Sequence, residues 1–162
     1  MPEVLINCVN ESVATIFETI IGDRPEYRGD DEDKMVGDGV VGIISFVGDV
    51  TWLMMLALPR KTANHITQRF CGFDVDYDSP DMGDVVGELA NVLAGDVVAR
   101  LGGEGVKVAM SLPTILRGKN VEPLLPRGLP HKKMHFSLPE GELMIKIAGA
   151  RQGETVGRAP GS

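Results

Sequence analysis

The sequence has no excess of positive charge and few cysteines. Lysine and arginine together number 16 against 23 aspartates and glutamates, which gives a formal net charge of −7 at pH 7. Nucleic-acid binding draws much of its affinity from cationic side chains that neutralise phosphates, so this class of function is disfavoured. The two cysteines, Cys8 and Cys71, are too few for a disulfide framework. They predict reduced, buried thiols in a cytoplasmic protein.

A membrane span and a leader peptide are also disfavoured. Residues 39–58 are mostly apolar over about the length of a membrane span. Asp49 lies at the middle of this stretch, where a charge costs about 2.5–3.5 kcal/mol on insertion scales. Two strands joined by a turn explain the same residues better. The first twenty residues are amphipathic and carry three glutamates, so we expect no secretory signal there.

Hydrophobic periodicity predicts an α+β fold in one domain. Apolar residues spaced by three and four predict helices over 2–21, 61–70 and 81–101. Short apolar or alternating runs predict strands over 40–46, 51–58, 106–112, 134–138 and 143–147. Helices mixed with hairpins indicate a mainly antiparallel sheet packed with helices. We expect the domain to cover residues 1–148, with a long loop over 117–130 and a flexible tail over 149–162.

Histidines, acidic residues and glycines outside the helices offer no clear metal or phosphate site. The three histidines are scattered without the spacing of metal ligands: His65, His131 and His135. The acidic run 30–33 could bind a cation, but a solvated loop or strand edge explains it better. The glycine-rich segment 102–105 follows a predicted helix and precedes a predicted strand, the reverse of a phosphate-binding loop, and therefore indicates a turn.

The helix predicted over 81–101 carries three polar residues on one face, opposite its apolar stripe. At about 100° per residue, Glu88 lies about 40° from Asp84, and Asn91 lies about 20° on the other side of Asp84. Asparagine is a poor helix former, and Gly87 and Gly95 each cost about 1 kcal/mol relative to alanine. These costs fit a surface that a partner's backbone approaches closely. A plain polar face, with glycines that accommodate helix packing, would have the same pattern.

The run from Asp84 to Asn91 resembles the Asp/Ser-x-x-x-Glu-x-x-Asn signature of the CheC/CheX/FliY phosphatases. A proline follows downstream in that family, and Pro113 stands there in this sequence. Residues 7–22 resemble the family's first helix and residues 39–59 its glycine-rich hairpin, so that the likeness covers roughly residues 4–148. The signature occurs once here, whereas CheC-type members usually carry two copies. The resemblance is therefore to the CheX-like branch.

This resemblance implies a phosphatase that hydrolyses the aspartyl phosphate of a CheY-like response regulator. It implies that Asn91 orients the attacking water and that Glu88 pairs with the active-site lysine of the receiver domain. Asp84 and Pro113 would be supporting residues, with Pro113 shaping the end of its strand. The resemblance implies no metal bound by this chain, because the receiver holds the Mg²⁺. It also implies a homodimer.

Other interpretations of the same residues stay open at this point. Since a fold does not guarantee an activity, the chain could be a non-catalytic module that docks a receiver or another signalling protein. It could also be an unrelated α+β domain. The apolar residues Trp52, Met54 and Met55 of the predicted strand 51–58 could form a dimer interface or pack in the core.

Overall fold

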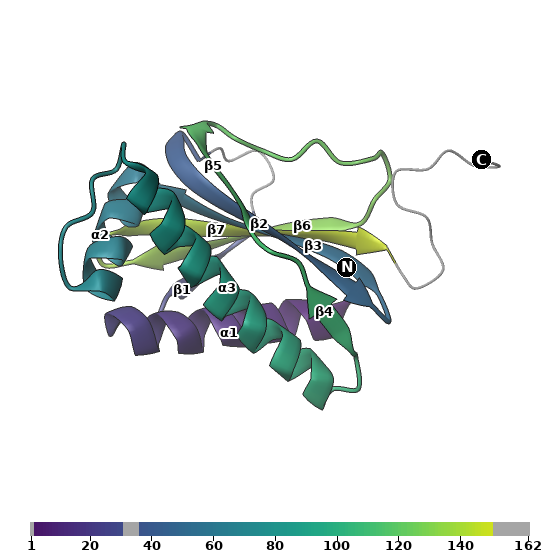
Figure 1. Ribbon diagram of the computed structural model, residues 1–162. Coiled ribbons are helices and arrows are strands. Elements are labelled where there is room, and N and C mark those ends of the chain that lie inside the picture. The colour runs from purple at the N-terminus through teal and green to yellow at the C-terminus, as the bar shows by residue number, and fades with distance from the viewer. Residues whose placement is uncertain (1, 31–35, 151–162) are drawn as a thin grey trace.

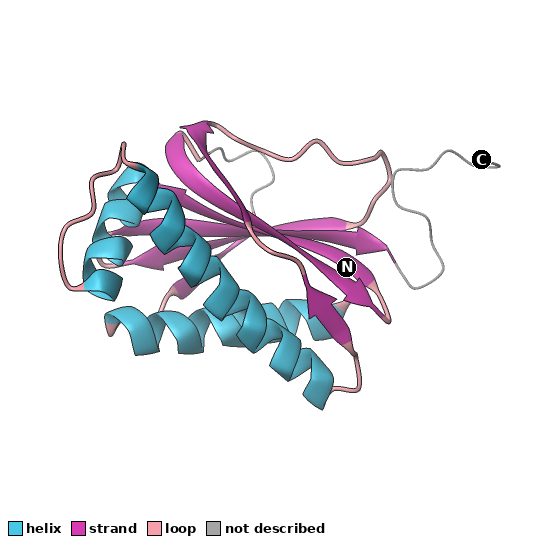
Figure 2. Cartoon of the chain, in the orientation of Figure 1, coloured by secondary structure: helices cyan, strands magenta, loops and turns pink. Residues whose placement is uncertain are grey.

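The three predicted amphipathic helices lie together on one face of a single sheet (Figures 1 and 2). The computed structural model describes residues 2–30 and 36–150. The helices are α1 (Glu3–Ile21), α2 (Arg60–Cys71) and α3 (Pro80–Gly103). The strands are β1 (Glu26–Gly29), β2 (Asp38–Gly48), β3 (Thr51–Pro59), β4 (Val108–Met110), β5 (Thr114–Lys119), β6 (His131–Leu138) and β7 (Gly141–Ala150). The predicted α+β class is confirmed.

All neighbouring strands of the sheet pair antiparallel, in the order β1-β6-β7-β3-β2-β4. Strand β5 also pairs with β2, opposite residues 38–43, while β4 pairs with residues 46–48 of the same strand. Pro113 lies in the break between β4 and β5, as expected for a residue that cannot donate a ladder hydrogen bond. The β2–β3 hairpin confirms that residues 39–58 are two strands and a turn.

The core lies between the helices and the sheet, and each helix contributes one buried stripe. The stripe of α3 consists of Met82, Val86, Leu89, Leu93 and Val97. The helix approaches the sheet closely at Gly42 of β2, where an added Cβ would lie 3.3 Å from the Ala90 Cβ and 3.2 Å from the Ile115 Cδ1. Because one side of α3 is fixed in this way, its opposite side faces solvent.

Helix α1 is long and apolar enough to cross a membrane by length and composition alone. The same composition is explained by packing, because its apolar residues Leu5, Val9, Val13 and Phe17 are fully buried in the core. A core helix and a membrane span meet the same criterion of length and composition. The burial of α1 therefore accounts for its hydrophobicity without a membrane.

The segment after α3 differs from its prediction. The strand predicted over 106–112 is the shorter β4, and part of the predicted loop 117–130 belongs to β5, which runs to Lys119. All six residues of β5 are exposed or half-buried, and their sequence shows no regular apolar alternation. Its formation depends on pairing with β2, which is more than sixty residues away in the chain.

The structure decides one open alternative about buried residues and corrects one expectation. Trp52, Met54 and Met55 are at most 3% exposed, so they pack within this chain and do not offer an interface. Both cysteines are free as predicted, and Cys8 is buried, but Cys71 at the end of α2 is partly exposed.

Two predicted segments lie mostly outside the described residues. Strand β7 includes residues 149 and 150, and the rest of the predicted tail, 151–162, is not described. Of the acidic run, Asp30 is described, where it accepts a hydrogen bond from the Tyr27 hydroxyl and pairs with Lys132 at 3.1 Å.

Candidate functional site

The candidate site is the solvent side of α3, which we call the α3 ridge and define as Asp84, Glu88, Asn91 and Gly95. Asp84 and Glu88 are exposed and Asn91 is half-buried, while the opposite side of the helix is in the core. At Gly95 an added Cβ would meet no atom within 4 Å, so the helix backbone is open to solvent there. The structure thus places the three polar residues predicted from the sequence on one face.

The polar side chains of the α3 ridge have no partners in the described part of the chain. Neither Asp84, Glu88 nor Asn91 makes a side-chain hydrogen bond or an ion pair with another described residue. Their carboxylate and amide groups are therefore available to groups of a second molecule. The surface is rigid because the buried side of the same helix packs tightly on the sheet.

Strand β5 and the residue before it pack beside the ridge. An added Cβ at Gly87 would lie 3.6 Å from the Ile115 Cγ1 and 3.8 Å from the Pro113 Cγ. Gly87 is buried, so this glycine serves the packing of β5 on the helix. Gly95 is the glycine that leaves the backbone open. Pro113 therefore supports the helix at the residue before Glu88 and lies outside the ridge itself.

Arg117 of β5 forms hydrogen bonds with the residues just before α3. Its Nη1 donates hydrogen bonds to the carbonyl oxygens of Tyr77, at 2.9 Å, and of Ser79, at 3.0 Å. Ser79 is the N-cap residue of α3, and Pro80 follows at the first helical position. The Tyr77 ring is buried, which raises the pKa of its hydroxyl, and its centroid lies 4.4 Å from the Arg60 guanidinium.

Sequence reasoning did not identify Arg117 or Ile115 as residues that support the site. Both lie in a segment next to several prolines and glycines, which are typical of a loop. Neither residue lies within the helix or the signature, and their contacts to α3 follow from the pairing of β5 with β2. The one available signal was Pro113, which draws attention to this segment of the chain. It does not indicate that the segment packs on α3.

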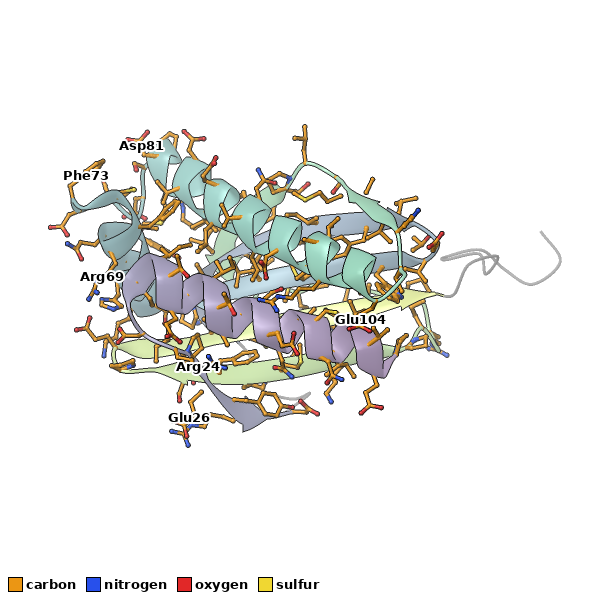
Figure 3. All side chains as sticks on the ribbon, turned by 90° about the horizontal axis from the view of Figure 1, so that it is seen from below. Arg24, Glu26, Arg69, Phe73, Asp81 and Glu104 are labelled. Atoms are coloured by element: carbon orange, nitrogen blue, oxygen red, sulfur yellow. The ribbon has the colours of Figure 1, made fainter. Side chains whose placement is uncertain are left out.

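Two hollows lie away from the ridge. A hollow of about 440 Å³ lies between α1 and β1, near Arg24 and Glu26, and another of about 300 Å³ lies beside Glu104 at the end of α3. Figure 3 labels these three residues. Among residues 2–30 and 36–150, no group of three or more histidines, cysteines or acidic residues could hold a metal ion. The turn predicted over 102–105 is found at 104–105, because Gly102 and Gly103 still belong to α3. The Gly105 N–H donates to the Gly102 carbonyl at 3.1 Å.

Comparison with known proteins identifies related sequences through a family model. The model of the family described as chemotaxis phosphatase CheX matches residues 40–137, which is more than half of the chain. The matched region begins in the β2–β3 hairpin and includes all of α3 with its ridge. No curated protein matches the sequence.

Solved structures of chemotaxis proteins have the same fold. A CheC-like superfamily protein from Shewanella sp. PV-4 superposes with a TM-score of 0.83 at 22% identity, over 93% of this chain and 99% of that one. Chemotaxis protein CheX from Vibrio vulnificus gives 0.81 at 21% identity, over 90% and 99%. A chain of the CheX–CheY–BeF3–Mg²⁺ complex from Borrelia burgdorferi gives 0.75 at 19% identity, over 91% and 98%. These likenesses establish the CheC/CheX-like fold.

Proposed function

Because the chain belongs to the chemotaxis phosphatase CheX family, we propose that it hydrolyses the aspartyl phosphate of a CheY-like response regulator. The observation that carries this proposal is the pair Glu88 and Asn91, which lies on one open helix face without partners in the described chain. A phosphorylated protein is too large to enter a pocket, so it has to bind to an exposed surface of the phosphatase. The complex of a related CheX with CheY, BeF3 and Mg²⁺ supports a receiver domain as the partner.

In this proposal Asn91 orients the attacking water. Its amide can accept a hydrogen bond from water and donate one to a phosphoryl oxygen, and it is neither a base nor a nucleophile. The water oxygen forms a bond to phosphorus while the acyl P–O bond breaks, which leaves the receiver aspartate as a carboxylate. Phosphoryl transfer depends mainly on position and on stabilisation of charge, so one well-placed amide can have a large effect.

Glu88 docks to the receiver by pairing with the ammonium group of its active-site lysine. The pair would form between two exposed groups that become covered when the proteins meet, which strengthens it relative to a surface ion pair. Asp84, one turn before Glu88 on the ridge, is proposed to assist docking. Pro113 supports the helix from the position directly before β5. The Mg²⁺ of the reaction is held by the receiver, where it neutralises charge on the phosphoryl group.

We also propose that the chain acts in the cytoplasm as a homodimer. The reducing conditions of that compartment would keep Cys8 and Cys71 free. The sheet ends at strand β1 on one side, and the unpaired backbone groups of an edge strand can pair with another chain. Sedimentation equilibrium measures the mass in solution, and a single species of 17.4 kDa at micromolar concentration would contradict the dimer.

The decisive experiment follows the decay of a CheY-like receiver phosphorylated by acetyl phosphate. The wild-type chain should accelerate phosphate loss, and Asn91→Ala and Glu88→Ala should each abolish the acceleration while the protein stays folded. Asn64→Ala is the matched control, because Asn64 is an exposed asparagine on α2, away from the ridge. If the wild-type chain binds the phosphorylated receiver but leaves its decay unchanged or slower, the chain is a non-catalytic module.

A further inference from the structure

Leu112 is an apolar side chain that the fold holds out into solvent. It lies in the short link between β4 and β5, and 86% of its surface is exposed. The preceding residue fastens this link to β2. The Ser45 N–H donates to the Ser111 Oγ at 2.9 Å, and the Ser111 N–H donates to the Ser45 carbonyl at 2.8 Å. The Ser111 hydroxyl in turn donates to the Leu112 carbonyl oxygen at 2.9 Å.

The next residue places Leu112 beside the α3 ridge. Pro113 packs against Gly87, which directly precedes Glu88 in the helix. Leu112 is therefore fastened on both sides, by Ser111 to the sheet and by Pro113 to the helix. The backbone of such a link loses little further conformational freedom when a second surface covers it, so only the rotamers of the leucine side chain have to be ordered.

A second exposed apolar residue lies on the other flank of the ridge. Val92 is 38% exposed. In helical projection Val92 lies about 40° from Glu88, on the side away from Asn91. Gly87, which contacts the link that carries Leu112, lies about 40° from Asn91, on the side away from Glu88. The link that carries Leu112 and the exposed side chain of Val92 thus lie on opposite flanks of the polar pair.

From this arrangement we infer that Leu112 and Val92 are the apolar docking contacts for the phosphorylated face of the receiver. The inference rests on the proposed function and names the contacts that give it affinity. Polar groups in an interface act most strongly where apolar contacts around them exclude water. The Leu112 link and Val92 lie on opposite flanks of Glu88 and Asn91, so we expect a receiver seated on the polar pair to cover both apolar side chains as well.

The expected effect lies in binding rather than in chemistry. Leu112 has no polar group that could take part in phosphoryl transfer, so its contact is equally strong before and during the reaction. Loss of such a contact raises KM and leaves kcat unchanged. Burial of a leucine side chain corresponds to about a tenfold difference in affinity or more, and we expect Leu112→Ala to raise KM by about that factor.

The test compares two leucines that differ in place but not in exposure. Leu124 is 92% exposed and lies between β5 and β6, in a segment that runs on the side of the sheet away from the helices (Figure 1). Initial rates of receiver dephosphorylation give KM and kcat for the wild type, Leu112→Ala, Leu112→Met and Leu124→Ala. Titration with a beryllofluoride-loaded receiver gives Kd for the same four proteins.

We expect KM and Kd to rise about tenfold for Leu112→Ala, and to stay near the wild-type values for Leu112→Met and Leu124→Ala. Equal values for the two alanine variants, with an active wild type, would overturn this inference and leave the proposed function standing. A wild type that neither binds the receiver nor accelerates its decay would overturn the proposed function as well. Thermal unfolding curves check that all four proteins are folded.

Discussion

The two halves of α3 differ in whether their polar side chains bond to other residues of the chain. In the second half, the Arg100 guanidinium donates to the Asp96 carboxylate at 2.7 Å, to Glu11 of α1 at 3.1 Å and to the Thr15 hydroxyl at 3.1 Å. In the first half, Glu88 and Asn91 have no partner among the described residues. Both halves share the same buried stripe and the same sheet beneath it.

This difference separates polar residues that stabilise the fold from polar residues that remain available for a partner. A partly buried charge bonded to three groups contributes to the free energy of unfolding. An open carboxylate and amide on a rigid helix contribute little to it, and their presence is explained by another molecule. The comparison therefore predicts that stability and activity respond to substitutions in different halves of one helix.

The largest expected effect is on activity, in the first half. Asn91→Ala and Glu88→Ala should each lower the rate of receiver dephosphorylation by about 100-fold or more, because the water or the receiver loses its position. Their midpoints of urea unfolding should match that of the wild type, because no internal bond is removed. Single-turnover decay and urea titration measure the two quantities. If Asn91→Ala and Glu88→Ala lowered the free energy of unfolding as well as the activity, the proposed distinction between the two halves of α3 would be wrong.

Arg117 tests how the beginning of the helix positions the ridge. Arg117→Ala removes two hydrogen bonds to the loop carbonyls at the start of α3, and we expect about a tenfold fall in kcat with a smaller change in KM. Arg60→Ala is the matched control, because it removes a cation from the same Tyr77 ring without those bonds. Steady-state kinetics of both variants should show the larger fall in kcat for Arg117→Ala. Equal effects would mean that Arg117 has no special part in positioning.

Arg100 should show the reverse pattern in the second half. Its side chain is 30% exposed and that of Asp96 is 25% exposed, so Arg100→Ala should lower the free energy of unfolding by about 1–2 kcal/mol. Activity should stay within about twofold of the wild type, because no step of phosphoryl transfer uses this residue. Arg24→Ala is the control, since its ion pair with Glu18 is exposed and long, at 3.5 Å. Urea unfolding that gave equal losses for the two variants would contradict this prediction.

The smallest effect concerns Tyr27, another polar group with an internal partner. Burial and the hydrogen bond to Asp30 raise the pKa of its hydroxyl to about 12. The unfolded chain releases this proton near its ordinary pKa of about 10, so stability due to the neutral phenol is present below that pH and is lost as pH rises toward about 12. Absorbance at the phenolate band, compared with Tyr27→Phe, measures the titration. A tyrosine that ionises near its ordinary pKa would contradict the internal bond.

The signals that succeeded in the sequence are local ones. Spacings of three and four identified each helix within a few residues of its ends, because a buried stripe has to repeat with the helical turn. The same helical geometry is sufficient to place Asp84, Glu88 and Asn91 on one face. The β2–β3 hairpin was also predictable, because its two strands and its turn are adjacent in the chain.

Tertiary contacts decided what surrounds that face. Strand β5 has no clear periodicity and exists by pairing with a distant strand, and through it Pro113, Ile115 and Arg117 reach α3. Whether a polar residue is bonded or open also depends on elements far away in the sequence, as with Arg100 and Glu11. The sequence thus determined which residues form the ridge, since helical spacing is local. Only the folded chain determined that the ridge is open and that Pro113 and Ile115 pack beside it, since pairing and burial depend on residues distant in sequence.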